Sequence, residues 1–114
     1  MAHSKAEQFV TPYDINHIIS KYGLAVGYPA RILIMRWLAA EGPKRAGEIS
    51  DFIELAKSTT SHHLRSLEHA GVITGVERGP NITYEFNKAG YAALRFYFMK
   101  IFDEIDGLEG DGGK

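Results

Sequence analysis

Residues 58–73 read STTSHHLRSLEHAGVI, and this stretch decides the fold. Placed on a helix, Thr60, Leu64 and Leu67 are three and four residues apart, so they form a narrow inward stripe with Ala56 below it. The other side is rich in hydroxyl, imidazole and cationic side chains. A helix face that only meets water favours Glu, Lys and Ala, whereas the Ser and Thr residues here give up helix propensity.

The outward side of this helix carries side chains that suit DNA. Short donors and a long forked cation reach phosphate oxygens and base edges in a major groove. A preceding helix over residues 46–53, joined by a tight turn, makes the pair a helix-turn-helix. The alternative, a merely solvated polar face, stays open at this point. The DNA-binding residues that we expect are Lys57, Ser58, Thr59, Ser61, His62, Arg65 and, on a following hairpin, Arg78.

Apolar periodicity predicts two helices before this pair. Thr11 and Pro12 form a helix start, and the helix that follows is amphipathic and ends by Gly27. A second helix opens at Pro29 and is apolar all round, so we expect it to be the buried centre, with Trp37 in the core. It breaks before residue 43, at a Gly-Pro pair.

After the helix-turn-helix, the spacing of apolar residues changes from a helical period to strict alternation. Residues 72–78 and 82–86 form a predicted hairpin, with residues 79–81 as its turn. Asn87 can cap a last helix that is too apolar for one face, and such a helix calls for a second partner. Packing against a second copy explains it; a pocket for an apolar effector is the alternative.

Composition limits the classes of protein. The chain has 114 residues, 45% of them hydrophobic, which makes one domain with a core of modest size. We expect flexible residues 1–10, a single domain over residues 11–106, and a disordered, acidic, Gly-rich tail over residues 107–114. The apolar runs are too short to cross a membrane, and the polar start lacks a secretion signal, so we expect a cytoplasmic protein.

Net charge is −1, which by itself argues against a nucleic-acid partner. The average hides an asymmetry, because residues 103–114 hold five acids and one lysine. The rest of the chain is therefore mildly basic. There is no cysteine, which excludes disulfides and thiolate metal sites in this sequence.

Two stretches resemble the ArsR/SmtB type of winged-helix repressor. Residues 24–35 are similar to the family's opening, in which an Asp-Pro-x-Arg motif precedes Ile-Leu; here Gly-Tyr-Pro-Ala-Arg-Ile-Leu stands. Residues 58–64 and 67–73 are similar to its Ser-x-x-Ser-His-His-Leu core and Ala-Gly-Leu-Val exit. The resemblance covers roughly residues 24–86. It implies a mainly α fold with a β-hairpin wing, a winged helix-turn-helix.

The resemblance also implies a function and an assembly. Such a protein is a homodimeric transcriptional repressor that binds a double-stranded DNA operator, with its first and last helices forming the dimer interface. The expected interface residues on those helices are Ile15, Ile18, Ile19, Tyr22, Tyr97, Phe98, Ile101 and Phe102.

The family's metal sensors have no full counterpart here. Residues 43–48 offer no thiol where many members carry a cysteine pair. Asp103, Glu104 and Asp106 stand near a second family site, but no histidine joins them, and carboxylates alone bind borderline metals weakly. Asp14 and His17 lack an evident third ligand. We therefore expect no metal and no cofactor.

Two adjacent histidines lie in the middle of the expected recognition helix. We expect His62 to point outward and His63 to lie partly buried beside Leu67 or the wing. No phosphate loop or nucleophile with an evident base is present, so we expect no enzyme. The alternative to a DNA reader is a winged-helix protein-interaction module with weak or no specific DNA binding, favoured by the missing sensor and the near-neutral charge.

Overall fold

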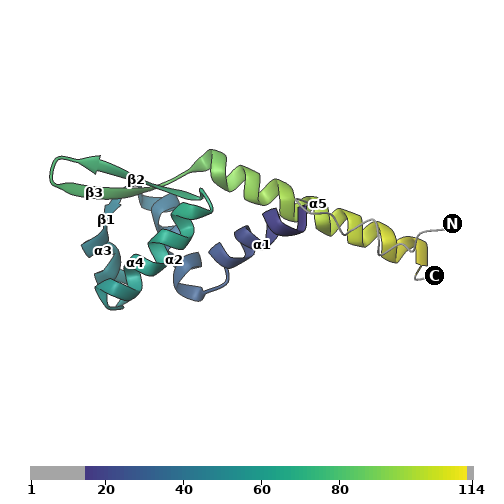
Figure 1. Ribbon diagram of the computed structural model, residues 1–114, viewed down its shortest axis with the longest axis horizontal. Helices are drawn as coiled ribbons and strands as arrows, with labels where there is room; N and C mark the ends of the chain where they lie inside the picture. The colour runs from purple at the N-terminus through teal and green to yellow at the C-terminus, as the bar shows by residue number, and fades with distance from the viewer. Residues whose placement is uncertain (1–14, 113–114) are drawn as a thin grey trace.

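The computed structural model describes the backbone of residues 15–112 and the side chains of residues 15–108. A winged-helix body occupies one end of the molecule, and the last helix leaves it as a long projection (Figure 1). The predicted order of four helices, a hairpin and a helix is confirmed, with one short strand added. The elements are α1 (Ile15–Ala25), α2 (Pro29–Glu41), β1 (Lys44–Arg45), α3 (Ala46–Ile53), α4 (Lys57–His69), β2 (Ile73–Arg78), β3 (Asn81–Phe86) and α5 (Lys88–Gly112).

The three strands form one antiparallel sheet in the order β1-β3-β2. Strand β1 was not predicted, because two residues are too few for an alternating pattern; Lys44 pairs with Tyr84 of β3. The wing turn is also tighter than predicted, since Asn81 belongs to β3 and pairs with Arg78. Gly79 has a φ of 64°, a conformation that glycine adopts without strain.

The core lies where α2, α3, α4 and the sheet meet. One side of α2 supplies Ile34 and Leu38, which are at most 1% exposed. The prediction that α2 is the buried centre holds for this side only, because Ile32 and Leu33 on its other side are 40% and 38% exposed. Helices α3 and α4 and strand β3 pack against α2 and leave Ile32 and Leu33 exposed. Trp37 lies at the rim, half-buried and stacked on a phenylalanine of α3 rather than enclosed in the core.

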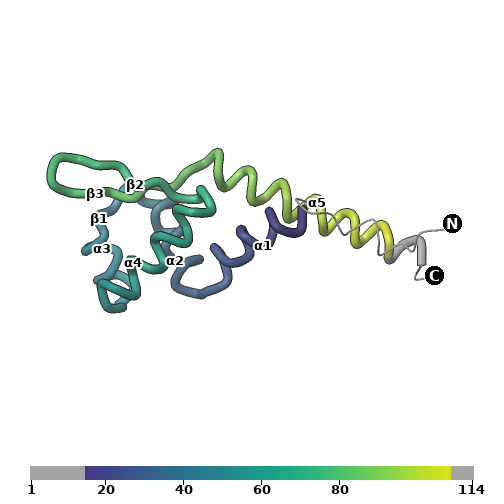
Figure 2. Tube along the Cα trace, viewed as in Figure 1, coloured from purple at the N-terminus to yellow at the C-terminus, as the bar shows by residue number. Residues whose placement is uncertain are grey.

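Helix α5 begins at a cap that also ties it to the wing. Asn87 accepts a hydrogen bond from the Gly90 backbone N–H through Oδ1 (2.9 Å) and donates one from Nδ2 to the Thr74 hydroxyl (3.1 Å). The predicted cap is therefore confirmed. Helix α1 lies along the first part of α5 (Figure 2), where the rings of Tyr22 and Tyr97 stack with centroids 6.0 Å apart.

Only the C-terminal end of the predicted domain can be compared with the structure. The expected helix start at Thr11 and Pro12 and the expected flexible residues 1–10 lie outside the described residues. Helix α5 runs to Gly112, further than the predicted domain end at residue 106. The division into domain and tail stays a prediction.

Candidate nucleic-acid interface

Two helices joined by a short turn position the candidate interface. Helix α3 packs on α4, and the hydroxyls of Ser50 and Thr60 are hydrogen-bonded at 2.8 Å between them, in the buried interior. Ser50 also contacts the Leu55 carbonyl at 3.2 Å, within the turn. Glu54 bends the turn with a φ of 56°, the only positive φ of a non-glycine residue in the described chain. The turn therefore has the left-handed residue that a glycine would supply without strain.

Helix α4 is divided into two faces much as its sequence predicts. Thr60, Leu64 and Leu67 are at most 2% exposed, so the inward stripe is confirmed. Ala56 is exposed and does not extend that stripe. It lies at the N-cap, before the helical period begins, so helical spacing does not apply to its direction.

The predicted DNA-binding residues of α4 lie on its outward side. Ser61 is half-buried, beside a groove of about 250 Å³ between the starts of α3 and α4 that Lys57 and Gly47 also line. The arrangement presents donors and cations together, while the opposite stripe holds the helix against the body. That these side chains contact DNA stays a prediction. The exposed ones are Lys57, Ser58, Thr59, His62 and Arg65.

Arg78 lies at the end of β2, beside the wing turn, but its side chain runs along the wing. Its guanidinium donates hydrogen bonds to the Thr83 hydroxyl (3.1 Å) and to the Glu85 carboxylate (3.0 Å). The pairing is exposed, so it costs little to break. Arg78 is thus accessible at the wing, and a phosphate would have to compete with Glu85 for it.

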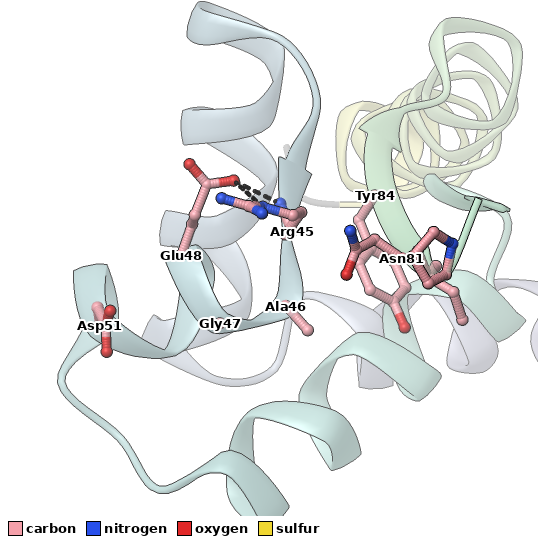
Figure 3. A pocket seen from close by; sticks show the side chains of 9 residues that line it. Arg45, Ala46, Gly47, Glu48, Asp51, Asn81 and Tyr84 are labelled. Atoms are coloured by element: carbon pink, nitrogen blue, oxygen red, sulfur yellow. Dashed lines mark hydrogen bonds and ion pairs between the residues drawn. The ribbon is translucent and has the colours of Figure 1, made fainter. Parts of the chain in front are cut away.

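A cleft of about 530 Å³ separates the start of α3 from the wing (Figure 3). Tyr84 and Asn81 line it from the wing, and Arg45, Glu48 and Asp51 from the helix side. The Arg45 backbone N–H donates to the Glu48 carboxylate at 2.9 Å, and this hydrogen bond, aided by the Arg45 guanidinium, lowers the pKa of Glu48. Two carboxylates against one guanidinium make this cleft a poor place for a phosphate.

His63 is buried against an element that the sequence did not indicate. It is 7% exposed and packs against the start of α2, where Arg31 Nε donates to its Nδ1 at 3.0 Å. The prediction that His63 rests beside Leu67 or the wing is corrected by this contact. Burial, then the Arg31 cation and His62, lower the pKa of His63. Arg31, an arginine within an apolar helix, indicates a polar contact in the sequence but does not identify His63 as its partner.

The predicted dimer residues occupy different environments within one protomer. Ile19 and Tyr22 are buried already, and the others except Phe102 are half-buried. Phe102 is 50% exposed. Three more residues of the wide apolar pattern of α5 are exposed as well, although they were not among the expected interface residues: Phe96, Met99 and Ile105.

The described residues contain neither a metal-ligand group nor a membrane-spanning helix. No three histidine or acidic side chains between residues 15 and 108 are grouped as metal ligands would be. In the part of the chain that the structure covers, no helix combines the length and hydropathy needed to cross a membrane.

The chain is similar to known proteins in both sequence and fold. Residues 28–74 match the family model described as bacterial regulatory protein, arsR family, and this range runs from the start of α2 to the start of β2. No curated protein matches the chain.

Solved structures of similar fold cover most of the chain. A possible transcriptional regulator for arsenical resistance is 27% identical, with a TM-score of 0.66, over 81% of this chain and 96% of that one. An ArsR-like transcriptional regulator from Rhodococcus sp. RHA1 is 17% identical, with a TM-score of 0.70, over 85% and 94%. The homodimeric winged helix-turn-helix DNA-binding domain of a possible ArsR-family regulator from Mycobacterium bovis is 19% identical, with a TM-score of 0.63, over 91% of each chain.

Proposed function

The chain carries the winged helix-turn-helix DNA-binding domain of the ArsR family of transcriptional regulators, and we propose that it represses transcription as a sequence-specific homodimer. One observation carries the proposal. The outward face of α4 presents hydroxyls, His62 and Arg65, while a fully buried stripe and the Ser50–Thr60 hydrogen bond hold the helix in place. A rigid helix with exposed donors suits a major groove.

Each predicted residue has a role that its position supports. Arg65, near the middle of α4, has the length and the fork to bond a guanine edge, and His62 lies one turn before it. Ser58, Thr59 and Ser61 are short donors for phosphates or bases near the start of the helix, where Lys57 is a point charge for a phosphate. Arg78 extends the contact to a neighbouring groove or backbone by exchanging Glu85 for a phosphate.

Dimerisation raises the affinity for DNA, which the net charge of the protein alone would leave weak. The net charge of −1 gives weak non-specific attraction to DNA, so two linked recognition helices are needed for tight binding. We infer that the first and last helices form the interface. The exposed apolar side chains along α5 support this assembly, because a lone helix in water would leave them uncovered.

The first test is selection of DNA from a random pool by the purified protein, with the affinity of the best duplex followed as salt is raised. We expect an inverted repeat whose half-sites are about one helical turn apart, and binding that falls steeply with salt. The variants Arg65→Ala and His62→Ala should each weaken binding to that duplex by about 1–3 kcal/mol, about 5- to 150-fold.

Lys21→Ala is the matched control, because Lys21 is an exposed cation on α1 rather than on the recognition helix. Its affinity for the duplex, and the fall of that affinity with salt concentration, should equal those of the parent protein. Unchanged operator binding in both α4 variants would show that the recognition helix does not read the DNA in this way.

A second candidate function is a protein-interaction module that keeps the fold without specific DNA reading. An apolar groove of about 350 Å³ at the corner of α1 and α2, lined by the exposed side chains of Tyr28, Ile32 and Leu33, favours it. Weak, sequence-independent DNA binding together with tight binding to a protein would support this function over the first. An enriched operator would reject it.

A further inference from the structure

A buried arginine joins three helices behind the recognition face. Arg31 of α2 is 3% exposed. Its Nη1 donates to the Leu24 carbonyl near the end of α1, at 2.5 Å, and its Nε donates to His63 Nδ1 on α4, at 3.0 Å. Its guanidinium carbon lies 4.2 Å from the centre of the Tyr28 ring. One side chain therefore links α1, α2 and α4.

Among the described residues, the partners of the Arg31 cation include no carboxylate. Within residues 15–108 it forms no ion pair with Asp or Glu. A carbonyl at a helix C-terminus, an imidazole lone pair and an aromatic face together take the place of water around the guanidinium. A buried charge held in this way needs each of these partners, because an unmet donor in the interior is costly.

The contact requires His63 to be neutral. Nδ1 accepts from Arg31, so that nitrogen carries no proton and the ring proton is on Nε2. Among residues 15–108, the groups that face the ring are Arg31 from α2, the Tyr28 ring before α2 (centroids 5.6 Å apart) and His62 on its own helix (6.2 Å). None of them is an acid. A proton on Nδ1 would remove the acceptor and place a second positive charge against the guanidinium.

We propose that Arg31 and His63 are positioning residues for the DNA-reading face, and that proton uptake by His63 releases α4 from α1 and α2 and lowers the affinity for DNA. The inference rests on the proposed function, which it deepens. His63 is next to His62, so a shift at the buried ring moves the predicted contact residues with it. The lowered pKa of His63 agrees with this geometry.

The test compares pH profiles of DNA affinity, using the duplex most enriched at pH 7.5. The host variant is His62→Gln, so that the exposed imidazole next to His63 is absent from every protein compared. In this host we expect affinity to fall at least fivefold between pH 7.5 and 5.5. One linked proton allows at most about tenfold per pH unit.

His63→Gln in the same host should abolish the fall. Glutamine can accept from Arg31 through its side-chain oxygen but does not titrate in this range, so its affinity should change less than twofold. His69→Gln is the matched control, since it removes an exposed imidazole from the same helix, and it should follow the host. An equal fall in the host and in His63→Gln would overturn the proposal.

Measuring stability without DNA tests the neutral state of His63 independently of DNA binding. His63 has a lowered pKa when folded, so the unfolded chain binds more protons as the pH falls below about 6.5. Its contribution to stability is therefore complete above that pH and is lost on acidification. Denaturant unfolding should show a smaller loss between pH 7.5 and 5.5 for His63→Gln than for the parent.

The outcomes are distinguishable. If no duplex is enriched, the proposed function is rejected, and the proton effect on DNA binding is rejected with it. If a duplex is enriched but the stability of His63→Gln follows that of the parent, His63 is not held neutral in the fold and the positioning role alone is rejected.

Discussion

At the scale of single residues, one hydroxyl pair decides how the helix-turn-helix is held. Thr60 is part of the inward stripe that helical spacing predicted, but spacing did not name its partner. Ser50 lies ten residues earlier and its hydroxyl reaches Thr60 at 2.8 Å and the Leu55 carbonyl at 3.2 Å. Buried hydroxyls without partners are destabilising, so this pair matters more than an exposed one.

Replacing Ser50 should weaken the fold measurably. In Ser50→Ala, the buried Thr60 hydroxyl and the Leu55 carbonyl lose a partner, and we expect the free energy of unfolding to fall by about 1–3 kcal/mol. Urea unfolding measures it. Ser20→Ala, which removes an exposed hydroxyl bonded to the His17 carbonyl, is the control and should cost at most about 0.5 kcal/mol. Equal losses in the two variants would contradict the role given to Ser50.

Helical spacing predicted the direction of the His63 side chain but not its partner. Adjacent histidines on a helix point in different directions, so His62 was expected outward and His63 inward, as the structure has them. Its partner is Arg31, 32 residues earlier in the chain. A period within one helix indicates a face but not which element covers it. For this reason the Arg31 contact could not be read from the sequence.

At the scale of elements, a close backbone approach sets where α5 leaves the body. A side chain carbon built at Gly90 would lie 1.7 Å from the Gly71 carbonyl oxygen, well inside any permitted contact. The start of α5 therefore rests directly on the turn that ends α4. Gly71 in turn has a φ of 81°, as the C-terminus of that helix requires.

Gly90→Ala should force these two elements apart. The clash is with backbone rather than with a flexible side chain, so we expect a loss of about 3 kcal/mol in the free energy of unfolding. Thermal and denaturant unfolding measure it. Gly23→Ala is the control, since nothing lies within 4 Å of its added carbon and alanine favours a helix by up to about 1 kcal/mol. A Gly90→Ala protein as stable as the control would mean that α5 does not rest on Gly71.

At the scale of the whole molecule, α5 projects beyond the body (Figure 1), and several of its apolar side chains are exposed. Phe96 and Phe102 are 60% and 50% exposed, and Ile105 is 53% exposed. Helix α1 covers one side of the first part of α5 only, where Tyr22 meets Tyr97. A second copy of the chain would bury the rest, and the sequence had already indicated this by an apolar pattern wider than one face.

Phe102→Glu should shift the protein from dimer to monomer. A carboxylate would be buried at the proposed interface, which is costly without a partner. Sedimentation at micromolar concentration should give a dimer for the parent and a monomer for the variant. Lys88→Glu, an exposed site at the other end of α5, is the control and should remain dimeric. A parent that sediments as a monomer would reject the dimer and, with it, the proposed pairing of half-sites.

The amino-acid sequence was enough to predict the five helices, the hairpin and the inward face of α4. Helical and alternating periods, caps and turn residues act over a few neighbours, so they are written in the chain locally. Only the tertiary structure decided which face of α2 is open, where β1 pairs, and that Arg31 joins His63 behind the recognition helix. These depend on contacts between distant segments, whose geometry is set by how all the elements pack at once.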